Sequence, residues 1–183
     1  MGQMKKTIQI SILALLVSIG AFPQGLIRPN KPALTLDAST GFITINELNA
    51  GFGLGGVATP YSKSFFGFTT VNGYQVNETF LAGAGTGILL YNDGPMIPLF
   101  LEFRLRILIE KFTPYLSGSG GLLLNPSDFN TGTRMFINPS AGVRYTLNRN
   151  LGVTLSTGLL MQMGSNVGRS SFINIRSGVV YKF

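Results

Sequence analysis

The sequence of 183 residues contains no cysteine, no histidine and no tryptophan. The absence of histidine excludes the Ser-His, Cys-His and Asp-His pairs with which many hydrolases activate a nucleophile. The absence of cysteine excludes disulfide bonds, thiolate metal sites and a lipid-modified N-terminal cysteine. The seven acidic residues are scattered along the chain. We therefore expect no catalytic residues, no metal site and no cofactor.

Charge is also scarce. Charged residues make up 11% of the chain, which is less than half of the roughly 25% usual for a soluble domain. This composition indicates that much of the surface faces a medium other than water. The net charge is +7, but the basic residues after Lys5 and Lys6 are spread singly and form no basic stripe. We therefore expect no nucleic-acid partner.

Long apolar runs are absent beyond the N-terminus. No later segment has 18 consecutive apolar residues, so if the mature chain crosses a membrane, it does not cross with helices. Near the start, Lys5 and Lys6 precede a short apolar run over residues 8–21. This run has the length of a secretory signal and is too short to span a bilayer.

These features divide the chain into three parts. We predict a secretory signal peptide over residues 1–24, with cleavage between Gly20 and Gly25, and an uncleaved anchor is the alternative. Residues 25–40 predict an irregular lead-in. Residues 41–183 are expected to form one domain.

From Gly41 onward, apolar and polar residues alternate with period two, which is typical of strands whose two faces meet different surroundings. In the stretch from Ile97 to Leu108, one face is wholly apolar, whereas the other carries Glu102, Arg104 and Arg106. The alternation predicts eight strands, over residues 41–55, 63–74, 79–91, 96–109, 112–124, 133–147, 150–163 and 170–183.

Each predicted strand reaches the roughly 9–11 residues that a tilted strand needs to cross a bilayer. A spanning sheet must close, because an open edge leaves backbone groups without partners in hydrocarbon. We therefore predict an all-β fold, a closed eight-stranded antiparallel up-and-down transmembrane β-barrel surrounded by outer-membrane lipid. Tight turns should lie at the periplasmic side, and the connections expected at the outer side are Gly56–Ser62, Asn92–Pro95, Asn125–Gly132 and Gly164–Arg169.

Two residue types provide further tests of this barrel. Tyrosines near strand ends are expected in the aromatic belts at the membrane interfaces. Glycines at period two should let the barrel curve and leave room for inward neighbours. The tyrosines are Tyr61, Tyr74, Tyr91, Tyr115, Tyr145 and Tyr181, and the glycines are Gly51, Gly53, Gly55, Gly83, Gly85, Gly87, Gly118, Gly120 and Gly121.

The chain ends on an apolar face that carries Val179, Tyr181 and the terminal Phe183. This ending resembles the C-terminal signal of outer-membrane barrels. The stretch from Asn72 to Gly87 is also similar to small eight-stranded outer-membrane β-barrel proteins, which share their architecture with the membrane domain of outer membrane protein A. The resemblance implies the outer membrane of a Gram-negative bacterium as location. It also implies the barrel-assembly machinery and periplasmic chaperones as partners during biogenesis, and it does not identify an external partner.

Charged residues on the inward face are the one constellation that we retain as a candidate site. We expect them to form an ion-pair network that plugs the lumen, because a buried charge without a partner is costly. Glu47 and Arg176, near the middle of neighbouring strands, are the best predicted pair. Water or a bound anion would have to compensate the surplus of positive charge. The set is Glu47, Glu102, Arg104, Arg106, Arg144, Arg176 and Lys182.

The sequence thus favours an outer-membrane protein of structural or interaction type without catalysis. A narrow anion-preferring channel is the alternative, since the inward set has more bases than acids. A secreted lipocalin-like carrier of an apolar ligand would need apolar residues inside and charged residues outside. A lipid acyl hydrolase on the same scaffold would need the histidine that this chain lacks.

Overall fold

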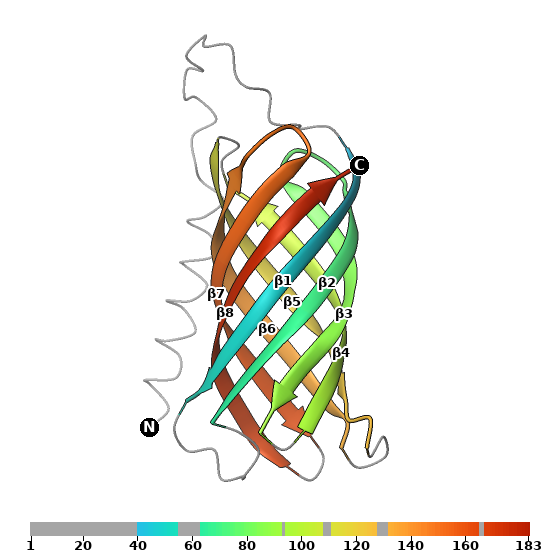
Figure 1. The fold of residues 1–183 in the computed structure, drawn as a ribbon, viewed down its shortest axis with the longest axis vertical. Coiled ribbons are helices and arrows are strands. Elements are labelled where there is room, and N and C mark those ends of the chain that lie inside the picture. Colours follow the sequence, from blue (N-terminus) through green and yellow to red (C-terminus); the bar gives the residue numbers. More distant parts are fainter. Residues whose placement is uncertain (1–39, 55–62, 93, 108–110, 128–131, 165–166) are drawn as a thin grey trace, which may run out of the picture. The chain divides into compact units, whose positions relative to one another are not determined.

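The computed structural model describes residues 40–54, 63–92, 94–107, 111–127, 132–164 and 167–183. These residues form eight antiparallel strands in sequence order, and the pairing of β1 with β8 closes the sheet into a barrel (Figure 1). The predicted fold class is therefore confirmed. The strands are β1 Gly41–Gly53, β2 Ser64–Gln75, β3 Phe80–Tyr91, β4 Gly94–Arg106, β5 Phe112–Leu124, β6 Arg134–Thr146, β7 Leu151–Gly164 and β8 Val167–Lys182.

Several expectations concern residues outside the described ranges. The predicted signal peptide and nearly all of the lead-in lie there, as do the loop Gly56–Ser62 and the central part of Asn125–Gly132. Within the described residues, no helix is long and apolar enough to cross a membrane.

Two of the predicted loops are shorter than expected. β4 begins at Gly94, whose φ of 131° suits a residue without a side chain, so Gly94 and Pro95 belong to the strand and not to the loop. β8 begins at Val167, so the predicted loop Gly164–Arg169 is wrong over most of its length. The β7–β8 pairing continues through this region, with an irregular register between Gln162 and Gly164.

Asparagine side chains shape two of the tight turns. In the β2–β3 turn, Asn77 Oδ1 accepts hydrogen bonds from the backbone N–H groups of Thr79 and Phe80 at 2.9 and 2.8 Å. Asn148 does the same in the β6–β7 turn, with the N–H groups of Asn150 and Leu151 at 2.9 and 2.8 Å. These local bonds satisfy backbone donors that the strands no longer pair, which fixes where each hairpin reverses.

The two faces of the sheet differ as the alternation predicts. Leu101 and Leu155 on the outward face are 58% and 55% exposed, whereas the inward Arg104 and Arg176 are 5% and 3% exposed. Leucine, isoleucine, valine, methionine and phenylalanine side chains cover the outward face on all eight strands. An apolar ligand carrier needs the opposite arrangement, so the lipocalin-like alternative does not fit this barrel.

The interior is filled in layers. At the end where β2 and β8 begin, the Phe65 ring packs against the rings of Tyr91 and Phe172, with centroids 4.9 and 5.5 Å apart. Toward the other end, the buried aliphatic side chains of Ile43 and Val180 form part of the core. Polar and charged side chains occupy the middle of the barrel interior.

Two prolines, Pro98 on the inward face of β4 and Pro139 on the outward face of β6, coincide with gaps in the hydrogen-bonded ladder. The β3–β4 pairing lacks the residues Ile97 and Pro98, and the β6–β7 pairing lacks Asn138 and Pro139. Proline has no N–H to donate. At these two places, neighbouring strands are therefore held together by fewer backbone hydrogen bonds than elsewhere in the described barrel.

The glycines of β5 fall into two groups. Gly121 faces inward, where an added Cβ would overlap the backbone oxygen of Leu99. Gly118 faces outward, with no atom within 4 Å of an added Cβ. The expectation that period-two glycines leave room for inward neighbours is confirmed at Gly51 and Gly85, beside the rings of Phe65 and Phe100, and wrong at Gly118.

Candidate functional site in the barrel interior

Four buried charges meet in the middle of the lumen, and we call Glu47, Glu102, Arg104 and Arg176 the charge cluster. Arg104 contacts Glu47 at 2.8 Å through Nη2 and Glu102 at 2.5 Å through Nε. Arg176 Nη1 contacts one oxygen of Glu47 at 3.2 Å and one of Glu102 at 3.1 Å. Each carboxylate is thus shared by both guanidinium groups, and the four formal charges cancel.

The charge cluster joins the neighbouring strands β1 and β8 to β4, which is adjacent to neither of them. Glu47 lies on β1, Glu102 and Arg104 lie on β4, and Arg176 lies on β8. Arg176 Nη2 also donates to the hydroxyls of Ser117 on β5 and Ser140 on β6, at 3.1 and 2.6 Å. Side chains from five strands therefore hold one another in place across the lumen.

Neighbouring residues give the charge cluster its space and its partners. Gly178 on β8 stands beside Glu47, and a Cβ at this position would lie 2.6 Å from Glu47 Cγ. The guanidinium of Arg104 lies over the ring of Tyr115, 5.1 Å from its centroid, which is a favourable contact between a cation and an aromatic face. Because ions buried from water are stable only when they are paired and hydrogen-bonded, this surrounding structure is what makes the charges tolerable.

The structure places all seven predicted lumen charges on the inward face and brings four of them together. The predicted pair of Glu47 and Arg176 is present. The other three residues are not part of the charge cluster. Arg106 and Arg144 are half-buried and Lys182 is buried, all toward the end of the barrel where β8 ends.

One buried charge was missed by the sequence analysis. Arg134, the first residue of β6, is buried and donates to Gln162 Oε1 at 3.3 Å, and Gln162 in turn bonds the hydroxyl of Tyr91. The alternation contained the signal, because Arg134 has the same parity on β6 as Arg144, which belongs to the predicted inward set. Its position at the very start of the strand is why it was overlooked.

The tyrosine expectation holds only in part. Tyr74 and Tyr181 are exposed on the outward face, as an aromatic belt requires. Tyr115 is buried and faces the lumen, and Tyr91 packs inward against Phe65. Placing these two in the belts was therefore wrong.

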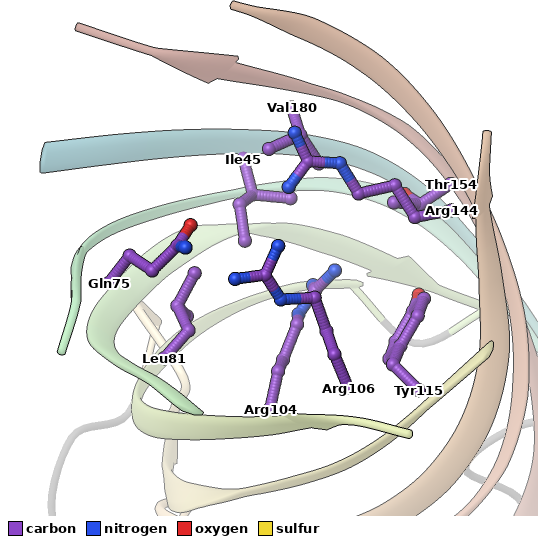
Figure 2. A pocket seen from close by; sticks show the side chains of 9 residues that line it. All are labelled: Ile45, Gln75, Leu81, Arg104, Arg106, Tyr115, Arg144, Thr154 and Val180. Carbon is purple, nitrogen blue, oxygen red and sulfur yellow. The ribbon is translucent and has the colours of Figure 1, made fainter. Parts of the chain in front are cut away.

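A cavity of about 20 Å³ lies beside the charge cluster, toward the end where β4 and β6 finish (Figure 2). Arg104, Arg106 and Arg144 line it together with the polar residues Gln75 and Tyr115, and none of the described lining residues is acidic. Figure 2 shows the Arg106 side chain reaching into the space between Gln75 and Tyr115. The cavity is therefore small, and three arginines share its lining with the aliphatic side chains of Ile45, Leu81 and Val180.

The chemistry available in this interior is electrostatic. Among the described residues, no group of three potential metal ligands comes together. The hydroxyls of Ser117 and Ser140 lie 2.7 Å apart and contact Arg176, but a guanidinium is always protonated and cannot act as a general base. The arrangement holds paired charges in place in the middle of the barrel.

The residues of the predicted C-terminal signal lie on the outward face. Val179, Tyr181 and Phe183 are exposed, and the rings of Tyr181 and Phe183 contact each other edge-on at 5.0 Å. The backbone N–H of Phe183 donates to the carbonyl of Phe42 at 3.1 Å. The end of the chain is thus tied to the beginning of β1 and presents its aromatic side chains outside the barrel.

Together, the closed eight-stranded architecture and the inside-out distribution of residues define a fold of the outer-membrane barrel type. The crystal structure of Neisserial surface protein A (NspA) has this fold, with a TM-score of 0.65, 13% sequence identity, and coverage of 79% of this chain and 99% of that chain. A structure from the de novo design of transmembrane beta-barrels aligns with a TM-score of 0.47 and 15% identity over 78% of this chain and 96% of that one. No family model and no curated protein matches the sequence.

Proposed function

We propose that this chain is an integral protein of the outer membrane of a Gram-negative bacterium, of structural or interaction type, with a lumen closed to ions and no catalytic activity. The observation that carries the proposal is the charge cluster in the middle of a packed lumen. The outward apolar face and the fold shared with NspA support the location.

The outward face suits hydrocarbon and not water. β4 presents Leu99, Leu101, Phe103 and Leu105 in succession, all exposed. Burial of apolar surface is worth about 25 cal/mol per Å², so a band of this kind around the barrel favours a bilayer strongly over water. A closed barrel meets the second requirement of hydrocarbon, because its strands have no free edge.

The interior supports a closed lumen. Both oxygens of Glu47 are used by Arg104 and Arg176, and both oxygens of Glu102 by the same two arginines. An ion passing along the axis would have to separate these pairs and would then have to cross the packed aromatic rings near Phe65. Both steps are costly in a low-dielectric interior.

The competing function is a narrow anion-preferring channel, and one observation favours it. The inward face carries Arg106, Arg134, Arg144 and Lys182 in addition to the neutral charge cluster. A lumen with a positive surplus would favour anions over cations. The packed lumen is the reason why we prefer the closed barrel.

Planar-bilayer recording separates the two functions. Purified protein inserted into a bilayer should give no conductance steps, whereas steps with anion selectivity would establish the channel. A variant with Glu47→Ala, Glu102→Ala, Arg104→Ala and Arg176→Ala removes the charge cluster as a neutral set, and conductance steps from this variant but not from the unmodified chain would show that the charge cluster closes the lumen. Membrane fractionation with heat-modifiable gel mobility tests the location independently, and recovery of the chain from the soluble periplasm would contradict it.

We also propose that Val179, Tyr181 and Phe183 form the signal that engages the barrel-assembly machinery. Their outward position leaves the aromatic side chains accessible before the barrel enters lipid. Partners outside the cell would contact the loops at the outer end of the barrel. The outward face of the strands contacts lipid.

A further inference from the structure

A group of polar side chains interrupts the apolar outward face of the barrel. Asn46 on β1 has Thr70 on β2 as its register partner, and Thr70 in turn has Thr86 on β3. Two residues before Asn46, Thr44 pairs with Asn72 on β2. Three of these side chains are exposed, whereas those of Thr44 and Thr70 are half-buried. We call these five residues the outer polar patch, and Figure 1 shows their three strands side by side.

The height of the outer polar patch makes its polarity unfavourable in lipid. Asn46 directly precedes Glu47 of the charge cluster, so its side chain lies level with the middle of the lumen but on the opposite face of the sheet. The polar row ends at β4, where the register partner of Thr86 is Leu99. Lipid chains offer neither donors nor acceptors, so a polar group that faces them without a partner costs free energy.

Hydrogen bonds within the barrel satisfy only part of the outer polar patch. Thr44 Oγ1 donates to Asn72 Oδ1 at 2.8 Å. Among the described residues, no other hydrogen bond involves a side chain of the patch. The N–H groups of both asparagine amides and the amide oxygen of Asn46 therefore remain available to a partner outside the chain.

Electrostatic complementarity indicates which partner fits. The outer polar patch carries no formal charge, and an asparagine amide is a donor and an acceptor at once, so an identical patch is its complement. In a two-fold arrangement the same surface of both copies meets, and the two Asn46 amides can exchange hydrogen bonds. Beside the patch, the short outward side chains of Ala82 and Ala84 on β3 allow the close approach that small residues give between membrane-spanning segments.

We propose that the outer polar patch is the interface of a homodimer within the outer membrane. The proposal rests on the proposed membrane location and goes beyond it by naming the partner, a second copy of this chain. Hydrogen bonds and close packing supply the affinity, because burying apolar surface against protein gives little advantage over lipid. The dimer removes Asn46, Thr70 and Thr86 from hydrocarbon and leaves the leucine-rich outward face of β4 in contact with lipid.

Energy transfer between labelled copies in lipid vesicles tests the dimer. The chain has no cysteine of its own, so Glu78→Cys in the exposed β2–β3 turn provides a single labelling site. Transfer should exceed that of randomly distributed monomers as the protein-to-lipid ratio rises. Asn46→Leu should raise the ratio for half association about tenfold, which is the loss expected for two hydrogen bonds in a membrane.

Matched variants separate the interface from misfolding and identify the partner. Thr157→Leu replaces an exposed outward polar residue on β7 and should leave association unchanged. Heat-modifiable gel mobility should show that Asn46→Leu and Thr157→Leu both fold. In the outer membranes of cells, oxidation of Thr70→Cys should give a disulfide-linked product of twice the mass of the chain, whereas Thr157→Cys should give far less of it.

Several outcomes would overturn the dimer. They are random energy transfer at every density, equal association of Asn46→Leu and the unmodified chain, and equal cross-linking at Thr70 and Thr157. A cross-linked product of another mass would place a different protein at the patch and would also overturn it. Flotation of the vesicles separates this failure from that of the proposed function. A chain that does not float contradicts the membrane location and the dimer together, whereas a chain that floats as a monomer overturns the dimer alone.

Discussion

Neutralising one carboxylate of the charge cluster provides the sharpest test of how the interior is stabilised. Glu102 is fully buried and contacts Arg104 at 2.5 Å and Arg176 at 3.1 Å. Glu102→Gln keeps the shape of the side chain but leaves two guanidinium groups to share the single carboxylate of Glu47. Removing one partner of a buried ion pair costs about 3–5 kcal/mol. Because the amide oxygen of the new glutamine still accepts a hydrogen bond, we expect Glu102→Gln to lower the free energy of unfolding by about 3 kcal/mol, the low end of this range.

A compensating substitution tells charge balance from lost packing. In Glu102→Gln combined with Arg104→Gln, the remaining Glu47 and Arg176 form a neutral pair at 3.2 Å. This double variant should recover about half or more of the stability lost by the single one, because the uncompensated charge is gone. Glu78→Gln, in the exposed β2–β3 turn, is the control and should change stability by less than about 0.5 kcal/mol.

The assay is urea-induced equilibrium unfolding of protein folded in lipid vesicles. The chain has no tryptophan, so far-UV circular dichroism and heat-modifiable gel mobility replace fluorescence. A loss of 3 kcal/mol lowers the folding equilibrium constant by a factor of roughly 100. The reasoning is refuted if Glu102→Gln is as stable as Glu78→Gln, or if the double variant is less stable than the single one by the full cost of a second lost partner.

Further predictions concern the outward face, the glycines and the C-terminus. Leu101→Arg, in the middle of β4, should lower the free energy of unfolding in vesicles by about 2–4 kcal/mol. Leu147→Arg, just beyond the end of β6, should lower it by about 0–1 kcal/mol. Equal losses of stability would contradict a bilayer around β4. Gly121→Ala should destabilise the barrel by about 1–3 kcal/mol through overlap with Leu99, and Gly118→Ala on the same strand should be neutral or slightly stabilising. Urea unfolding of both variants tests this prediction. If Gly118→Ala were the more destabilising variant, the assignment of the inward face of β5 would be wrong. Deletion of Phe183 should lower the amount of heat-modifiable barrel in the outer membrane of cells and leave spontaneous folding into vesicles unchanged; an equal defect in both assays would indicate that Phe183 acts on stability and not on assembly.

Most of the fold could be predicted because the alternation along each strand reports directly which side chains meet hydrocarbon. The Glu47–Arg176 pair was predictable for a related reason: both are inward residues near the middle of strands that close the barrel. The contact of Glu47 with Arg104 on β4 was not, because a side chain that crosses the lumen is not constrained by strand order. The alternation alone predicts Tyr115 inside, since it shares parity with Ser117 on β5, whereas the preference of tyrosine for membrane interfaces predicts an outward position.

The prediction failed at hairpin ends for a different reason. Glycine and proline indicated a loop at Asn92–Pro95, and polar residues indicated one at Gly164–Arg169. In the structure, Pro95 pairs with Leu90 and Gly164 pairs with Val167. Turn residues determine that the chain reverses, but the length of the flanking strands is set by the neighbouring ladder, which a local pattern does not contain.

The contacts of Arg176 determine the cross-section of the barrel. A barrel whose strands are joined only by hydrogen bonds between neighbours can be deformed toward an oval cross-section without breaking any of those bonds. Arg176 on β8 opposes such flattening. It contacts Glu102 on β4 and Ser117 and Ser140 on β5 and β6, and a change of diameter would separate these groups. The contacts of Arg176 across the interior therefore oppose changes in the cross-section of the barrel.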